Sequence, residues 1–410
     1  MINKHIFVLW VTLLISFYID SQDTLVYNIP KVYNFENIQG DTITNAQFTV
    51  SFLEKLYTQK HKNNQKINIL HIGDSHLQAD YITHTSRVSL QKIFGNAGRG
   101  FVSPLKISKS NEPFNYQTKS PNNWKSNRCV SSKIYQPIGL GGMSIKTEDS
   151  NAVIQLKTYN TDSMDYSFNK VYIYHTKGDS TFTIQISDSS SNLLIPNKQS
   201  EQPYRSTFSI SKNTSIVKIS TLKTDTIQKS FTFFGAVLEN ENSGILYHCV
   251  GINGAKYKDY YKTADFCNQT SSLSPDVILI SLGTNESFQK NFNSDKFYNE
   301  IDTLVTKLSI ANPNKPIILT TPANSFYYHQ INNNLPLISQ TIIQYASDKN
   351  LAYWDLFSIT GGENSAVLWK KANLLSKDGI HYSKDGYIHQ GNLLTKAIIN
   401  AYNKYVSIRH

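Results

Sequence analysis

The hydrophobic pattern of this chain changes its period twice, and this change is the strongest constraint on the fold. Near both ends, buried β-branched runs alternate with helical patterns, whereas from about residue 106 to 234 short runs alternate apolar and polar residues. Strands alternating with helices call for a parallel sheet covered on both faces, and period two is typical of antiparallel strands. The sequence therefore predicts an α/β domain with an all-β domain inserted into it.

The α/β portion is predicted from buried runs that end in turns and from apolar residues at helical spacing. The expected strands are 66–75, 276–283, 316–322 and 351–357. The expected helices cover about 81–94, 295–311, 335–348 and 385–405. In the second of these helices, Phe297, Ile301 and Leu304 fall on one face, which indicates an amphipathic helix packed on a sheet.

The inserted portion shows no helical pattern of any length. Its clearest runs are 152–159, 170–176, 180–187 and 214–220. In the third run, Phe182, Ile184 and Ile186 alternate with polar residues. Several such runs separated by turns predict a β-sandwich or a jelly-roll-like domain.

These patterns divide the chain into four segments. Residues 1–22 have a polar start, an apolar stretch at 6–18 and polar residues from Asp20 on, as a secretory signal does. The α/β domain then takes 23–105 and 235–410, and the β-insert takes 106–234. The apolar stretch is shorter than the roughly 20 residues of a membrane span. We therefore expect an exported protein, periplasmic, secreted or at the cell surface, without stable membrane insertion.

The net charge and the cysteine content limit which binding partners, metal sites and disulfides we expect. The formal net charge of +10 favours anionic partners, but the basic residues form no dense run, which argues against a nucleic-acid-binding protein. The spacing of Cys129, Cys249 and Cys267 fits no zinc site, and an odd count excludes a complete disulfide framework. Cys249 and Cys267 could pair with each other, although buried free thiols are the simpler interpretation.

Two distant motifs carry the residue types of a serine hydrolase. Ser75 lies in HIGDSHLQAD at 71–80, where a predicted strand turns into a helix, and Asp378 and His381 are three residues apart near the other end. A serine hydroxyl needs an adjacent base to take its proton, and a carboxylate on the second imidazole nitrogen fixes the tautomer. We therefore predict Ser75 as nucleophile, His381 as base and Asp378 as the triad acid. Taken alone, the second motif could equally be a solvated turn.

An acyl-transfer site also needs donors aimed at the developing oxyanion. The candidates are the N–H of Ser75, the N–H of Gly254 in HCVGINGAKYKDY, and the side-chain amide of Asn285 in SLGTNES. Each has a structural alternative, because glycine turns after strands are common and asparagine often caps a helix.

Four motifs, taken in chain order, resemble the four blocks of the SGNH hydrolases, also called GDSL esterases and lipases. They are Gly-Asp-Ser, the glycine turn, Gly-Thr-Asn and Asp-x-x-His. The resemblance implies a flavodoxin-like three-layer domain and gives Ser75, Gly254, Asn285 and His381 the family's four roles. NAGRGFVSP, GLGGMSIKT and WDLFSITGGENS are similar to the exported peptidoglycan O-acetylesterase group, which has an inserted β-sandwich resembling a carbohydrate-binding module. At the fourth position of the first block, His76 replaces the leucine of the GDSL name.

Other polar and aromatic residues have two interpretations each. His76, Gln78, Asp80 and Arg99 are candidate substrate contacts, or they are structural or solvated. Asp74 is expected to hold the turn through backbone hydrogen bonds. Four aromatic residues of the insert are candidates for sugar stacking, although strand aromatics more often belong to a core: Trp124, Tyr135, Tyr172 and Tyr174.

The expected function is that of a secreted serine esterase that removes O-acetyl groups from a polysaccharide, with peptidoglycan first and another acetylated glycan such as xylan second. No metal or organic cofactor is expected. An O-acetyltransferase with the same triad is an open alternative, and so is a glycan-binding protein with an inactive hydrolase domain. The sequence leaves the oligomeric state open.

Overall fold

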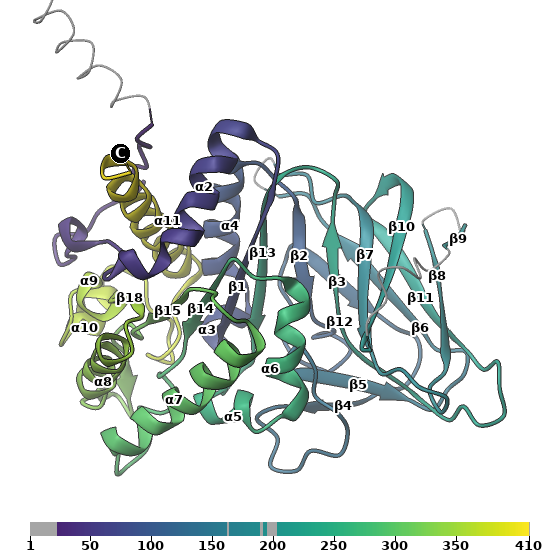
Figure 1. The fold of residues 1–410 in the computed structure, drawn as a ribbon. Helices are drawn as coiled ribbons and strands as arrows, with labels where there is room; N and C mark the ends of the chain where they lie inside the picture. Colours follow the sequence, from purple (N-terminus) through teal and green to yellow (C-terminus); the bar gives the residue numbers. More distant parts are fainter. Residues whose placement is uncertain (1–22, 162–163, 189–191, 195–202, 410) are drawn as a thin grey trace, which may run out of the picture.

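The computed structural model of this protein describes residues 23–161, 164–188, 192–194 and 203–409, and Figure 1 shows the arrangement of its helices and strands. The predicted signal at 1–22 lies outside the described residues. Among the helices that are described, none combines the length and the apolar character that crossing a bilayer requires.

A five-stranded sheet forms the centre of the α/β domain, and all of its strands are parallel. Its order is β13 (Gly244–Gly251), β1 (Lys66–Gly73), β14 (Val277–Ser281), β15 (Ile317–Thr320) and β18 (Ala352–Trp354). Because parallel strands end at the same edge, the segments that follow β1, β13 and β14 meet there. This edge therefore brings together the first three predicted blocks.

Helices cover both faces of this sheet, which explains why its strands are apolar throughout. In β1, Ile67 and Ile69 belong to one hydrophobic core, whereas Leu70 and Ile72 belong to the other. The first core is closed by α2 (Val50–Lys62), α4 (Tyr81–Phe94), α9 (Leu356–Ile359), α10 (Ser365–Lys371) and α11 (Lys384–Ser407). The second is closed by α5 (Tyr257–Tyr261), α6 (Ala264–Thr270), α7 (Ser294–Ala311) and α8 (Leu335–Asp348). This confirms the predicted α/β class.

The insert consists of two antiparallel sheets (Figure 1). Buried residues of both sheets belong to one hydrophobic core. One has the order β10 (Arg205–Thr214), β7 (Phe168–His175), β12 (Phe231–Glu239), β5 (Met143–Thr147) and β4 (Lys125–Arg128), with β2 (Gly98–Val102) also paired to β12. The other has the order β3 (Tyr116–Lys119), β6 (Val153–Thr158), β11 (Ile216–Leu222), β8 (Thr183–Ser187) and β9 (Leu193–Leu194). In β6 every second residue is buried, as period two predicts.

The insert is joined to the α/β domain through a shared core. β2 pairs with β12 and lies against β13, and the core of the insert continues into the face of the parallel sheet that α7 and α8 cover. At Gly100, which has a φ of 84°, an added Cβ would lie 2.4 Å from the Tyr247 carbonyl oxygen, so only glycine allows this approach. The antiparallel strands extend from Gly98 to Glu239, beyond the predicted limits of 106 and 234 on both sides.

Two local predictions differ from the structure. The run 351–357 is not one strand, because Asp355 ends β18 and its side chain accepts the Ser358 N–H at the start of α9. β13 was absent from the predicted strands, since His248 and Cys249 interrupt its apolar pattern. The remaining short elements are η1 (Ile38–Gly40), η2 (Ala46–Thr49), α3 (Ser75–Gln78), η4 (Ser271–Leu273), β16 (Phe326–Tyr327) and β17 (Gln330–Ile331). All three cysteines are free thiols.

Candidate active site

Ser75, His381 and Asp378 form a hydrogen-bonded chain at the carboxyl edge of the parallel sheet. Ser75 is the first residue of α3, directly after β1, and its Oγ lies 2.9 Å from His381 Nε2. His381 Nδ1 lies 2.7 Å from Asp378 Oδ2. A proton on Nδ1 satisfies the carboxylate and leaves Nε2 free to accept the hydroxyl proton of Ser75. This is the arrangement that general-base activation of a serine requires.

The loop between α10 and α11 holds the base and the acid in place. Leu375 pairs with Tyr382 across this loop, and the Ser376 N–H donates to the His381 carbonyl. Asp378 Oδ1 accepts the backbone N–H groups of Ile380 and His381, both at 2.9 Å. Burial opposes the ionisation of Asp378, but hydrogen bonds from the His381 ring and from these N–H groups lower its pKa below the usual value. Asp378 is therefore a carboxylate that can stabilise an imidazolium.

The turn before Ser75 depends on Gly73 and Asp74. An added Cβ at Gly73 would lie 2.5 Å from Leu77 Cδ1 and 2.8 Å from the Ser281 carbonyl oxygen. Asp74 is buried, and its Oδ1 accepts the His76 N–H at 2.9 Å. Burial raises the pKa of Asp74 to about 7. Asp74 therefore shapes the turn from the inside, as expected.

An open pocket of about 500 Å³ lies beside the triad. Ser75, Gly254, Asn285 and His381 all line it, so the fold brings the four block residues to one cavity. Gly254 has a φ of 82° and no atom within 4 Å of an added Cβ, which leaves its backbone open to the pocket. Among the described residues, no acceptor bonds the N–H of Ser75 or of Gly254. These two donors are available to an oxyanion.

The Asn285 amide lines the same pocket but already has acceptors. Its Nδ2 donates to Asp74 Oδ2 at 3.2 Å and to the Ala255 carbonyl oxygen at 3.1 Å. To donate to an oxyanion as well, the amide must share or exchange one of these bonds. The role of Asn285 as third donor therefore stays a prediction, with Asp74 as the group that orients its amide.

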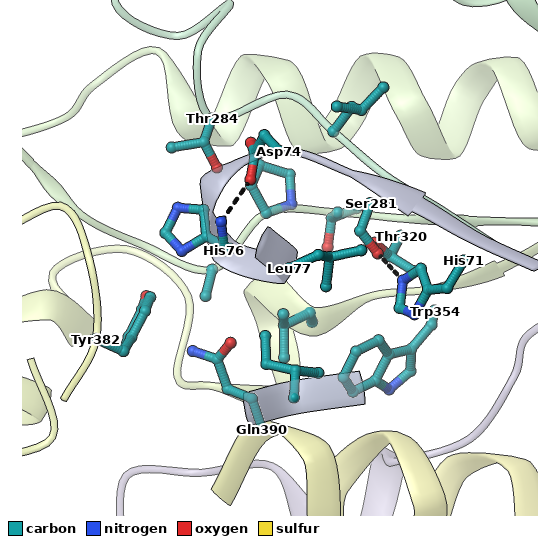
Figure 2. Close-up of a pocket in the computed structure, with 16 residues that line it drawn as sticks. His71, Asp74, His76, Leu77, Ser281, Thr284, Thr320, Trp354, Tyr382 and Gln390 are labelled. Carbon is teal, nitrogen blue, oxygen red and sulfur yellow. Dashed lines mark hydrogen bonds between the residues drawn. The ribbon is translucent and has the colours of Figure 1, made fainter. Parts of the chain in front are cut away.

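His76 does not line this pocket, although its ring centroid lies 5.3 Å from that of His381. Figure 2 shows it beside a second cavity, with Asp74, Tyr382 and Gln390 among the lining residues. At about 40 Å³ this cavity has room for water but not for a sugar. His76 Nδ1 lies 3.0 Å from the Tyr387 hydroxyl, and burial lowers the pKa of His76 to about 3. His76 is thus a neutral packing partner of the site.

Gln78 is buried and links three segments around the catalytic pocket. Its Oε1 accepts the Asn253 N–H at 2.8 Å, next to Gly254. Its Nε2 lies 2.9 Å from Ser110 Oγ and 2.5 Å from Asn111 Oδ1. Asn111 and Asn253 both line the pocket; Asn253 directly precedes Gly254 in the glycine turn, whereas no sequence motif contained Asn111. Gln78 therefore holds the walls of the pocket and is not exposed for substrate binding.

Asp80 and Arg99 form a buried ion cluster with Arg87. Arg87 Nη2 lies 2.7 Å and Arg99 Nη2 2.8 Å from the Asp80 carboxylate, which also accepts the Asn115 amide at 2.6 Å. Burial alone would raise the pKa of Asp80, but the two guanidinium groups outweigh it and hold this pKa well below its usual range. Asp80 is fully buried and Arg99 is 1% exposed. The expectation that they contact a glycan is corrected by this burial.

The aromatic candidates of the insert differ in exposure. Tyr174 is buried and accepts a hydrogen bond from Ser272 Oγ, whereas Tyr135 is 79% exposed. Trp124 and Tyr172 are half-buried against the core of the insert. Within the part of the chain that the structure describes, no group of three or more His, Cys, Asp and Glu side chains is arranged to hold a metal ion.

The fold and this site have the parts that a serine hydrolase needs: a Ser–His–Asp chain at the carboxyl edge of a parallel sheet, beside an open pocket. Residues 224–388 are similar to the GDSL-like lipase/acylhydrolase family, whose model they match. The matched region begins within the insert, between β11 and β12, and Ser75 lies outside it.

One solved structure extends the comparison to most of the chain. A peptidoglycan O-acetylesterase structure superposes with a TM-score of 0.73 at 20% identity, covering 91% of this chain and 99% of that chain. The two proteins therefore share the fold, insert included. A lipase/acylhydrolase from Enterococcus faecalis (19% identity, 39% of this chain, 77% of that chain) and an acetylxylan esterase from Geobacillus stearothermophilus (20% identity, 38% and 73%) each give a TM-score of 0.31. No curated protein matches the chain by sequence.

Proposed function

We propose that this protein is an exported serine esterase that removes O-acetyl groups from a polysaccharide, with peptidoglycan as the favoured substrate. The observation that carries the proposal is the hydrogen-bonded chain from Ser75 through His381 to Asp378 beside an open pocket. The similarity to the acylhydrolase family and the shared fold with a peptidoglycan O-acetylesterase support it.

The geometry supports a two-step mechanism. Ser75 Oγ attacks the acetyl carbonyl carbon while its proton passes to His381 Nε2, and Asp378 stabilises the resulting imidazolium. The N–H groups of Ser75 and Gly254, joined by the Asn285 amide, stabilise the oxyanion of the tetrahedral intermediate. When the intermediate collapses, the C–O bond to the sugar breaks and the sugar oxygen takes the proton from His381.

The second step returns the enzyme to its starting state. The same base removes a proton from water, and the hydroxide oxygen attacks the acetyl carbon of the acetyl-enzyme. Acetate leaves, and Ser75 recovers its proton from His381. Every bond broken and every proton moved in the two steps is accounted for with water as the sole co-reactant. The mechanism therefore needs no cofactor.

The pocket favours a short acyl group on a bulky polar alcohol. The pocket is open to solvent, and its lining combines apolar side chains such as Phe288 and Ile380 with the amides of Asn111 and Asn253. A sugar can hydrogen-bond to these amides, whereas a long acyl chain needs a continuous apolar channel. Export through the segment at 1–22 is part of the proposal, since an intact cell wall is reached from outside the cytoplasm.

The test is acetate release from O-acetylated peptidoglycan, acetylated xylan and p-nitrophenyl acetate by the wild type and by Ser75→Ala. We expect serine-dependent release that is fastest, per acetyl group, on peptidoglycan. Faster release from xylan would refute the substrate assignment and keep the esterase. Absence of serine-dependent release from all three would refute the esterase itself.

A further inference from the structure

A third cavity, open and of about 800 Å³, lies on the outer face of the insert. Its walls come from β3, β6 and β11 and from the segments 106–109 and 120–124. We call it the basic groove, because four lysines line it: Lys106, Lys109, Lys119 and Lys218. The catalytic mechanism uses none of these residues.

The charge of the basic groove is not neutralised by the protein. All four lysines are exposed, no carboxylate lines the groove, and within the described residues none of the four forms an ion pair. The nearby carboxyl of Glu112 feels the charge of Lys106 but bonds to the N–H and the hydroxyl of Thr118. That of Asp149 bonds to the Asn122 amide. A concave surface lined by one sign of charge attracts the opposite sign.

Trp124 gives the basic groove a fixed aromatic surface. Its Nε1 donates to Ser120 Oγ at 2.7 Å, and its ring packs edge to face on Phe231 with the centroids 6.4 Å apart. The ring is half-buried, so one part is anchored in the core while another part borders the groove. An immobilised indole beside ammonium groups suits a ligand with both an apolar ring face and negative charges. A sugar strand that carries carboxylates, on its rings or on attached peptides, has both.

The basic groove adjoins the catalytic pocket along the chain. Lys109 lines the groove, and Asn111, two residues later, lines the pocket. Two residues span at most about 7 Å. Gln78 and Asn253 both bond to Asn111 Oδ1, which fixes this segment relative to the site. A polymer that enters the pocket can therefore continue into the groove.

We propose that the basic groove binds a carboxylate-bearing stretch of the same polysaccharide strand whose acetyl ester lies at Ser75. This inference rests on the proposed esterase function and adds that the enzyme takes an anionic polymer rather than a neutral one. Peptidoglycan fits, because its peptides carry free carboxylates. Exposed lysines act as point charges screened by salt, so binding through the groove weakens as the ionic strength rises.

The test uses the full chain with Ser75→Ala, which separates binding from turnover. Binding to insoluble O-acetylated peptidoglycan is measured with this protein, with Lys119→Glu and Lys218→Glu added, and with Lys223→Glu and Lys229→Glu added instead. The last pair is the matched control, since both lysines are exposed on the insert and neither lines the groove. A further arm uses peptidoglycan whose carboxylates are blocked as amides.

We expect the groove variant to bind at least about tenfold more weakly at low salt, and blocked peptidoglycan to weaken the unsubstituted protein similarly. With Ser75 restored, the groove variant should lose kcat/KM on peptidoglycan by the same factor and keep its rate on p-nitrophenyl acetate. Equal weakening by the control pair, or unchanged binding to blocked peptidoglycan, would overturn the proposal. Failure of the esterase is recognised separately, because the wild type then shows no serine-dependent rate on the small ester or the polymer.

Discussion

Two clusters of charged and hydrogen-bonding side chains begin five residues apart, at Ser75 and at Asp80, and they differ in access to solvent. In the triad, the side chains of His381 and Asp378 are 39% and 46% exposed. In the other cluster, Asp80 and Arg87 are fully buried. A ligand can contact a side chain only where solvent reaches it, so the segment 71–80 contributes to one cluster that borders an open pocket and to one that is closed inside the fold.

The buried cluster joins parts of the chain that the fold must hold together. Asp80 lies at the start of α4, Arg99 in β2, and Asn115 just before β3, so the cluster ties the nucleophile segment to the first strands of the antiparallel sheets. A buried ion pair adds little net stability when it is complete, but removing one partner leaves an unpaired charge in a dry interior. The side chains of His381 and Asp378 are partly exposed, so removing one of them leaves no unpaired charge in a dry interior.

The largest effect is expected from removing the anion of the buried cluster. Asp80→Ala leaves Arg87 and Arg99 without their carboxylate and should lower the free energy of unfolding by about 3–5 kcal/mol. Urea unfolding monitored by fluorescence measures this change. Ser75→Ala is the control, and it should unfold at the wild-type urea concentration. Equal midpoints for Asp80→Ala and the wild type would show that the distinction between the two clusters is wrong.

The next effect concerns the catalytic cluster alone. Asn285→Ala removes one oxyanion donor and should lower kcat by about a hundredfold, with a much smaller change in KM. Steady-state kinetics on p-nitrophenyl acetate measures both constants. Because Asn285 also bonds to Asp74 and Ala255, thermal unfolding must show that the variant is folded. A folded variant with wild-type kcat would remove Asn285 from the oxyanion site.

Glu286 shows what burial does to a carboxyl group without a cationic partner, because it is buried like Asp80 but has no arginine beside it. Its Oε1 accepts the Tyr257 N–H at 2.8 Å, and Oε2 has no partner among the described residues. Burial raises the pKa of Glu286 to about 8, an effect that nearby Asp74 reinforces. The folded state therefore favours the protonated acid. This contribution to stability is complete below the unfolded pKa of about 4.3 and is lost as the pH rises towards 8.

Glu286→Gln keeps the shape of the side chain and removes its titration. Between pH 5 and pH 8, the wild type should lose about 1–3 kcal/mol more unfolding free energy than this variant. Urea midpoints at four pH values measure the difference. A residual slope in the variant is expected from Asp74, whose pKa burial raises to about 7. Parallel curves for the two proteins would contradict the assignment of Glu286.

The sequence could predict those helices and strands whose hydrophobic pattern is continuous along the chain. Helices α4, α7, α8 and α11 lie within one or two residues of their predicted limits, because each has an apolar face long enough to show a period. β13 and α9 were missed, because polar residues interrupt the strand and four residues cannot show a helical period.

The residues of the candidate site also fall into those that the sequence could predict and those that it could not. Local motifs were enough to select Ser75, Asp378 and His381, which the structure places within hydrogen-bond distance of one another. The structural functions of Asp80 and Gln78 could not be predicted from the sequence, because tertiary contacts determine which groups they bond to. Gln78 bonds to a backbone N–H 175 residues away, and no local spacing encodes such a contact.

Gln78 shares a feature with each cluster, since it is buried like Asp80 and is bonded to the walls of the pocket beside Ser75. The smallest change in rate is expected from substituting Gln78. Gln78→Leu removes the acceptor of the Asn253 N–H and the donor to Asn111, so Gly254 loses its alignment. Unsatisfied buried groups and a displaced donor should lower kcat about tenfold on p-nitrophenyl acetate. Gln78→Glu keeps the acceptor for Asn253 and should recover part of this loss, whereas a merely structural residue would change stability and leave kcat alone. Wild-type kcat in a destabilised Gln78→Leu protein would assign Gln78 to the architecture, together with Asp80.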